Sequence, residues 1–209
     1  AEAYRQALEQ AAIPPSSLDH VDLYSCFPVA VQMGARLLGF PTDGTRPLTV
    51  TGGLPYFGGA GNNYALHAVA TMVDRLRKRP GALGMVSALG WYLTKHAVGV
   101  YGSAPPTRPW ARSSPKERQP AIDALPHPEF VSAATGGGAV ETYTVLHDRD
   151  GAPREGVVVV RCDDGRRTLA LMESSPDVFD LFETEEMVGA SGTLFERADG
   201  RVELRLRGA

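Results

Sequence analysis

Short apolar runs alternate with amphipathic stretches along the first 104 residues of the chain. In the amphipathic stretches, apolar side chains recur three and four positions apart, the spacing of one helix face, and the apolar runs are short enough for buried strands. This pattern predicts helices over residues 1–12, 28–39 and 64–79, and strands over residues 18–23, 48–51, 84–88 and 97–101. After the first helix the order is β-α-β-α-β-β, which is typical of an α/β layer on a mostly parallel sheet.

Three connecting segments follow the predicted strands and carry many of the glycine and polar residues of this layer. They are residues 24–27, 52–63 and 88–96. In layers of this kind, ligand loops lie at the carboxyl ends of the strands. We therefore expect the three segments to converge on one edge and to form one site.

The second of these segments contains five glycines between positions 52 and 61. Glycine tolerates positive φ and lets a ligand approach main-chain N–H groups. Asn62 is a suitable N-cap for the helix that follows, so the positive end of that helix is expected to face the loop. The segment therefore suits an anion, an oxyanion or a polar ligand head. The alternative is a tight loop that lets the helix pack against the preceding strand.

The second half of the chain follows a different pattern. Prolines crowd residues 105–128 and glycines occupy positions 136–138, so residues 105–138 are predicted to form a linker or a segment that wraps the surface. Residues 139–209 contain short apolar runs separated by Asp-Gly turns, with a helical or irregular insert. The predicted strands cover residues 140–146, 156–162, 168–172, 189–196 and 202–206. They predict a small antiparallel barrel or sandwich, with an OB-like barrel among the alternatives.

Composition and charge narrow the classes of function. The chain has 209 residues, of which 43% are hydrophobic and 22% charged, the composition of an ordinary globular protein. Residues 1–104 carry eight Lys and Arg against six Asp and Glu, and residues 105–209 carry thirteen against eighteen. Neither part has the strongly basic surface that nucleic-acid binding requires, so no nucleic-acid partner is expected.

Cysteine usage and the apolar runs constrain the environment of the protein. Cys26 and Cys162 form neither a disulfide framework nor a metal-ligand spacing, so no metal is expected and a cytoplasmic location is predicted. No apolar run approaches the length of a membrane span, and no membrane partner is expected. The chain begins inside a helical pattern without an initiator methionine, and we expect a fragment, a processed chain or one part of a longer protein.

The run Tyr24-Ser25-Cys26-Phe27, the glycine-rich loop before a helix and the segment after Ala88 together resemble the three active-site loops in the C-terminal half of the thiolase superfamily. The resemblance is closest to sterol-carrier-type thiolases and to thiolase-like proteins of the acetyl-CoA acetyltransferase kind, and it covers residues 1–104. The tail from about residue 107 is similar to the additional C-terminal domain of some thiolase-like proteins. The resemblance implies a thiolase-like C-terminal half followed by a small β-rich domain.

The thiolase motifs are only partly retained. Where thiolases have Asn-Glu-Ala-Phe or His-Asp-Cys-Phe, Tyr24 stands at the place of the residue that helps to bind a water or oxyanion, Ser25 stands at the acidic place, and Cys26 matches the second version. Gly59 stands where the Gly-His-Pro motif has its histidine, and Ala88 where the Cys-x-Gly motif has its acid/base cysteine. The nucleophilic cysteine of the family belongs to the N-terminal half. The resemblance therefore implies that this chain alone lacks the groups for thiolysis or Claisen condensation.

The remaining chemistry-bearing residues each have two interpretations. His96 is a candidate substitute base or oxyanion donor, because imidazole titrates near neutral pH, or else a partly buried histidine at a strand end. Cys26 is a candidate reactive thiol just before a helix N-terminus, or else an inert core cysteine. Tyr24 and Ser25 are candidates for hydrogen bonds to a ligand carbonyl. The candidate contacts to a CoA thioester are Gly58, Gly59, Gly61 and Asn62.

The resemblance implies part of an acyl-CoA protein of lipid metabolism that binds or processes CoA thioesters, an acyltransferase if it is active. CoA or acyl-CoA is then a substrate or ligand, and no tightly bound cofactor is expected. The implied partner is an N-terminal thiolase half, in the same parent chain or on another polypeptide, and a dimer is an open alternative. A second hypothesis is a non-catalytic acyl-CoA-binding or scaffolding subunit, which Gly59 and Ala88 favour. The glycine-rich loop favours the first hypothesis.

Overall fold

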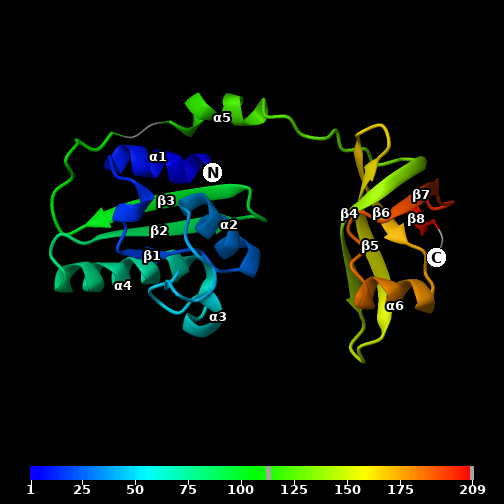
Figure 1. The fold of residues 1–209 in the computed structure, drawn as a ribbon, viewed down its shortest axis with the longest axis horizontal. Helices are drawn as coiled ribbons and strands as arrows, with labels where there is room; N and C mark the ends of the chain where they lie inside the picture. The colour runs from blue at the N-terminus through cyan, green and yellow to red at the C-terminus, as the bar shows by residue number, and fades with distance from the viewer. Residues whose placement is uncertain (112–113, 208–209) are drawn as a thin grey trace. The chain divides into compact units, whose positions relative to one another are not determined.

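The computed structural model describes residues 1–111 and 114–207 and divides the chain into two compact units, Ala1–Ser114 and Pro115–Ala209 (Figure 1). The first unit mixes helices with a sheet, and the second is a closed barrel. The boundary falls within residues 105–138, the range predicted as a linker. That range is not irregular throughout, because helix α5 (Pro115–Asp123) opens the second unit and strand β4 begins at Gly136.

The first unit follows the predicted succession of helices and strands closely, with one strand missing. Its elements are α1 (Glu2–Ala11), the 3-10 turn η1 (Pro15–Ser17), β1 (His20–Asp22), α2 (Pro28–Leu38), α3 (Leu54–Phe57), the 3-10 turn η2 (Gly61–Asn63), α4 (Tyr64–Lys78), β2 (Leu83–Gly90) and β3 (Lys95–Gly102). Helix α2 begins at Pro28, where a missing N–H costs nothing, and ends before Gly39, which takes a φ of 70°.

Helices cover both faces of the sheet. Met85 and Val86 are neighbours on β2 and therefore point to opposite faces. Met85 packs in one apolar cluster with side chains of α1 and α2, and Val86 packs in another with side chains of α4. Figure 1 shows α1 and α4 on opposite sides of the three strands. This arrangement leaves the strand ends and the loops that follow them free to form a site.

The strand predicted over residues 48–51 is absent from the structure. Two of its amides, those of Val50 and Thr51, donate to the carboxylate of Asp22, at 2.8 and 3.4 Å. The side chain of Asp22 thus accepts hydrogen bonds that these amides would donate to a neighbouring strand in a sheet. Within the described residues the sheet has three strands in the order β1-β2-β3, one pair parallel and one antiparallel, so the prediction of a mostly parallel four-stranded layer was wrong.

Residues 88–96, predicted as a loop, form the tip of a β-hairpin. Strands β2 and β3 stay paired as far as Gly90 and Lys95, which leaves only four residues for the turn. A turn this short requires left-handed backbone at positions where glycine is usual. Three residues that are not glycine adopt positive φ there, at 49°, 49° and 68°: Trp91, Tyr92 and Leu93.

The second unit is the predicted five-stranded barrel. Its elements after α5 are β4 (Gly136–His147), β5 (Pro153–Cys162), β6 (Arg167–Met172), α6 (Pro176–Thr184), β7 (Ser191–Glu196) and β8 (Val202–Leu206). The described strands close in the order β4-β5-β6-β8-β7, with β7 returning to β4, which is the Greek-key order of an OB-type barrel. The pairing of β6 with β8 is parallel, so the barrel is not antiparallel throughout as predicted.

The predicted Asp-Gly turns connect the barrel strands. Gly151, Gly165 and Gly200 take φ values of 85°, 86° and 77°, which the left-handed position of each turn requires. The apolar side chains that alternate along the strands point inward, and α6 closes one end of the core. The fully or nearly fully buried members of this core include Val140, Val158, Val160, Ala170, Met172, Phe179, Phe182, Leu194, Val202 and Leu204.

Candidate functional site

A buried carboxylate at the end of β1 organises the loops of the first unit. The side chain of Asp22 is fully buried. It accepts hydrogen bonds from the amide of Val50 at 2.8 Å and the hydroxyl of Tyr64 at 3.0 Å, and more weakly from Thr51. Burial raises the pKa of Asp22, and these hydrogen bonds partly oppose that shift. The carboxylate thereby ties the strand, the start of the glycine-rich loop and the first turn of α4 to one point.

The raised pKa predicts that Asp22 makes the fold less stable as the pH rises. The folded chain holds this proton more tightly than the unfolded chain, so the free energy of unfolding falls between the ordinary value of 3.8 and the higher folded pKa. Asp22→Asn removes the titration. Urea titrations at successive pH values give the free energy of unfolding of the parent protein and of Asp22→Asn. We expect the value for the parent minus the value for the variant to fall across this window and to level off above it. A difference that grows with pH there would contradict the raised pKa.

Ser25 and the backbone amide of Tyr24 link residues 24–27 to the glycine-rich loop and to strand β2. The Oγ of Ser25 accepts a hydrogen bond from the amide of Leu54 at 2.9 Å. A Cβ on Gly53 would lie only 3.0 Å from that Oγ, so the close approach requires glycine. The amide of Tyr24 donates to Ser87 Oγ on β2 at 3.0 Å. The structure thus brings residues 24–27 and the glycine-rich loop together, with the Ser25 hydroxyl engaged by the main chain.

The glycine-rich loop is exposed around its second glycine pair. Helix α3 separates Gly52 and Gly53 from this pair, and residues 58–61 are open to solvent. Among the residues that the structure describes, none accepts a hydrogen bond from the amide of Gly59 or of Ala60. Two successive N–H groups are therefore available to a ligand oxygen.

Asn62 does not cap helix α4. The N-cap position belongs to Asn63, and the 3-10 turn η2 leads into the helix before it. The side-chain amide nitrogen of Asn63 lies 2.9 Å from His67 Nε2, one helical turn further on. The prediction of Asn62 as the cap was therefore wrong by one position, because the turn that enters the helix is tighter than an α-turn.

His96 remains apart from this cluster, whereas Cys26 belongs to residues 24–27. His96 is exposed on the hairpin, and its Nε2 lies 2.7 Å from the carbonyl oxygen of Leu93 in the same turn. Cys26 is half-buried and carries a free thiol. In residues 1–111 and 114–207, no hydrogen bond joins His96 to residues 24–27 or 52–63. The imidazole therefore organises its own turn.

Three residues that organise the site were missed by the sequence reasoning. Asp22, Tyr64 and Ser87 supply the hydrogen bonds that hold the two loops together. The available signals were a carboxylate at the end of an apolar strand and a hydroxyl in the middle of another. Periodicity does not indicate that these polar groups meet, because their partners lie 13 to 63 positions away.

Neither a metal-ligand cluster nor a helix fit to cross a membrane occurs in the described part of the chain. No three side chains among its His, Cys, Asp and Glu residues gather closely enough to ligate a metal ion. None of its helices combines the length and the apolar character that a membrane crossing demands.

Two comparisons relate the chain to known proteins. Residues 117–201 match the family model of the thiolase-like protein type 1 additional C-terminal domain. The whole fold matches the crystal structure of a monomeric SCP2-thiolase-like protein type 1 from Mycobacterium smegmatis, with a TM-score of 0.86 and 35% sequence identity over 99% of this chain. The chain is a thiolase-like protein with an additional C-terminal domain.

The resemblance of the three loops to the thiolase superfamily is thereby confirmed at the level of family and fold. This thiolase-like chain covers 45% of the Mycobacterium smegmatis protein, less than half of its length. Among curated protein sequences, none matches the chain. What the chain binds must therefore be argued from its own residues.

Proposed function

We propose that this thiolase-like chain holds the thioester end of a CoA derivative against its glycine-rich loop and supplies no base of its own for thioester chemistry. The observation that carries the proposal is the pair of exposed amides at Gly59 and Ala60, which have no acceptor among the described residues. Adjacent N–H groups of this kind suit a carbonyl oxygen or an oxyanion.

The proposal also draws on how firmly the loop is attached. Asp22 holds its first residues, Ser25 holds its Leu54 amide, and Tyr64 fixes its far end to the same carboxylate. A preorganised donor pair binds more strongly than a mobile one, because little conformational entropy is lost on binding. Tyr56, 89% exposed on α3 beside the glycines, offers an apolar ring to the acyl or pantetheine chain.

The absence of a base in the proposal follows from the positions of the titratable groups. Thiolases carry a histidine and a cysteine where this chain has Gly59 and Ala88 by the motif comparison above. His96, the candidate replacement, is engaged with Leu93 in its own turn. Any chemistry on the thioester then depends on groups that this chain does not provide.

A proline substitution tests the amide pair. Ala60 has a φ of −74°, so Ala60→Pro fits the backbone and removes the N–H. We expect the chain to bind acetoacetyl-CoA in isothermal titration calorimetry, and Ala60→Pro to raise the Kd about tenfold, the loss of one hydrogen bond of about 1.4 kcal/mol. Ala60→Ser keeps the N–H and is the matched control. Equal affinity of the proline and serine variants would contradict the proposal, as would CoA release that His96→Ala abolishes.

The exposed face of α2 favours a second candidate function, a scaffolding contact with another thiolase half. Val29, Met33 and Leu37 follow one another at the spacing of a single helix face and are 47%, 47% and 44% exposed. Apolar stripes of this kind mark protein contacts. A chain that binds no acetoacetyl-CoA in the titration above would leave this scaffolding contact as the better-supported role.

A further inference from the structure

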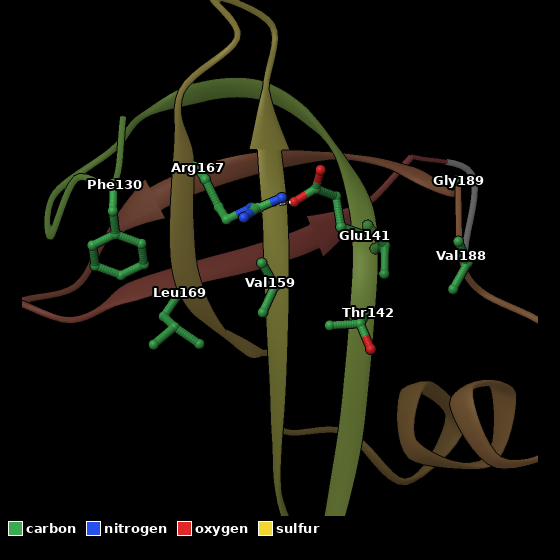
Figure 2. Close-up of a pocket in the computed structure, with 9 residues that line it drawn as sticks. Phe130, Glu141, Thr142, Val159, Arg167, Leu169, Val188 and Gly189 are labelled. Atoms are coloured by element: carbon green, nitrogen blue, oxygen red, sulfur yellow. Dashed lines mark hydrogen bonds and ion pairs between the residues drawn. The ribbon is translucent and has the colours of Figure 1, made fainter. Parts of the chain in front are cut away.

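The outer face of the barrel carries a hollow that the proposed function does not use. Its volume is about 690 Å³, within the range of small-molecule sites. Residues of β4, β5 and β6 form its floor, and chain segments beside them form its rim (Figure 2). Its lining combines apolar side chains with one ion pair: Phe130, Val159, Leu169 and Val188 with Glu141 and Arg167.

The floor of the hollow is apolar although it faces outward. On β5, Val158 and Val160 point into the core, so Val159 between them points out. Leu169 alternates in the same way between two buried neighbours on β6 and is 49% exposed. The outer face of a small barrel is ordinarily polar, and exposed apolar clusters of this kind mark binding surfaces.

Residues 129–131 form a short strap that holds the aromatic ring of Phe130 at the rim of the hollow. The amide of Val131 donates to the carbonyl of Arg167 at 2.8 Å, and the amide of Arg167 donates to the carbonyl of Glu129 at 2.8 Å. Phe130 lies between these bonds and is 56% exposed at one side of the hollow (Figure 2). Backbone pairing therefore holds an apolar wall in place before any ligand arrives.

Charged side chains lie beside Phe130, where two arginines surround one glutamate. A β-bulge between Val140 and Thr142 turns Glu141 toward two arginines. Arg161 donates to Glu141 at 2.6 and 2.8 Å, and Arg167 donates through its Nε alone. Within the described residues, no protein group accepts a hydrogen bond from the two terminal nitrogens of Arg167. Two guanidinium groups thus share one carboxylate, and one of them keeps a free edge.

We propose that this hollow binds the carboxylate of a medium-chain aliphatic acid, with its head on the free edge of Arg167 and its chain across Val159 and Leu169. A carboxylate matches two parallel N–H groups of a guanidinium, whereas a longer polyanion would meet the charge of Glu141. The apolar floor and the ring of Phe130 then cover the chain from water. This site lies in the second unit and does not depend on the proposed CoA function.

Decanoate is the probe that tests the head group, with the 209-residue chain. We expect saturable binding in isothermal titration calorimetry below the micelle concentration. Arg167→Gln should raise the Kd at least about tenfold, because a charge-assisted bidentate contact is lost. Arg166→Gln is the matched control, since Arg166 is the adjacent residue, pairs with Asp164 and lies outside the hollow. The same Kd for both variants, or no saturation in the parent protein, would overturn the proposal.

The aliphatic contact needs a separate test. Methyl NMR of the full chain should show decanoate-dependent shifts at Val159, Leu169 and Val188. Leu169→Ser should raise the Kd at least about fivefold, as expected for lost burial of a branched side chain. Phe195→Ser removes a comparably exposed apolar residue outside the hollow and should leave the Kd unchanged. Shifts confined to other parts of the chain would overturn the assignment even if decanoate binds.

Discussion

Replacing Asp22 by alanine is expected to lower the free energy of unfolding of the first unit by about 3–5 kcal/mol, because several buried donors lose their acceptor at about 1–3 kcal/mol each. The amide of Val50 and the hydroxyl of Tyr64 are both bonded to this carboxylate, and both residues are buried. Hydrogen exchange followed by mass spectrometry measures the loss within residues 1–111, apart from the barrel. The exchange of peptides that contain the glycine-rich loop and the start of α4 should rise most.

The control for this substitution is the same change at an aspartate on the surface. Asp43 is exposed, and among the described residues its carboxylate accepts hydrogen bonds only from Thr45, two residues further on. Asp43→Ala should therefore leave the exchange of the same peptides close to that of the parent protein. If the two alanine variants lost equal stability, Asp22 would not be the organising point of the site.

Phe182→Ala is expected to destabilise the barrel by about 3–5 kcal/mol, the usual cost of removing a buried phenyl ring. Phe182 is 4% exposed on α6, and its ring meets Tyr143 of β4 edge to face with centroids 4.9 Å apart. Its removal leaves a cavity beneath the helix that closes one end of the core. Faster hydrogen exchange in β4 and β5 is the measured outcome, because α6 packs on both strands.

Phe195→Ala is the matched control for the barrel. Phe195 is 42% exposed on β7, and the guanidinium of Arg205 lies over its ring. Because this ring is already partly in water, its loss should cost less than about 1 kcal/mol. A loss as large as that of Phe182→Ala would mean that the barrel is not held by its internal core.

Most helices and strands of both units could be predicted because they follow from local patterns. Short apolar runs and Asp-Gly turns after residue 139 predicted five strands, and the structure closes them into a barrel. Helical periodicity placed α1, α2 and α4 with errors of at most one residue at their ends. The parallel pairing of β6 with β8 could not be predicted, because it depends on where the chain re-enters the barrel after α6.

The candidate site was predicted less well, for a physical reason visible at two positions. Residues 48–51 have strand propensity, but the carboxylate of Asp22 accepts hydrogen bonds from the amides of Val50 and Thr51. Asp22 is distant in the sequence, so this contact leaves no periodic signal. His96 is the last residue of a predicted loop, yet ladder pairing continues past it and keeps it in a hairpin. Local propensity therefore loses to long-range hydrogen bonding at both places.

The hollow on the barrel had no sequence signal at all. Arg167 and Glu141 stand 26 residues apart, and each is an ordinary charged residue within a strand. A bulge in β4 and the backbone strap at Phe130 are what bring them to one face with an apolar floor.

The amino-acid sequence by itself determined the order of helices and strands, the division into an α/β unit and a barrel, and the family resemblance, because these rest on contacts between near neighbours and on motif residues in fixed order. Only the tertiary structure decided which polar groups meet. The bonds of Asp22 to Val50 and Tyr64, of Ser25 to Leu54 and of Arg167 to Glu141 each join segments more than twenty residues apart. Such contacts are selected by burial and hydrogen-bond satisfaction in the folded chain, and a linear pattern does not encode them.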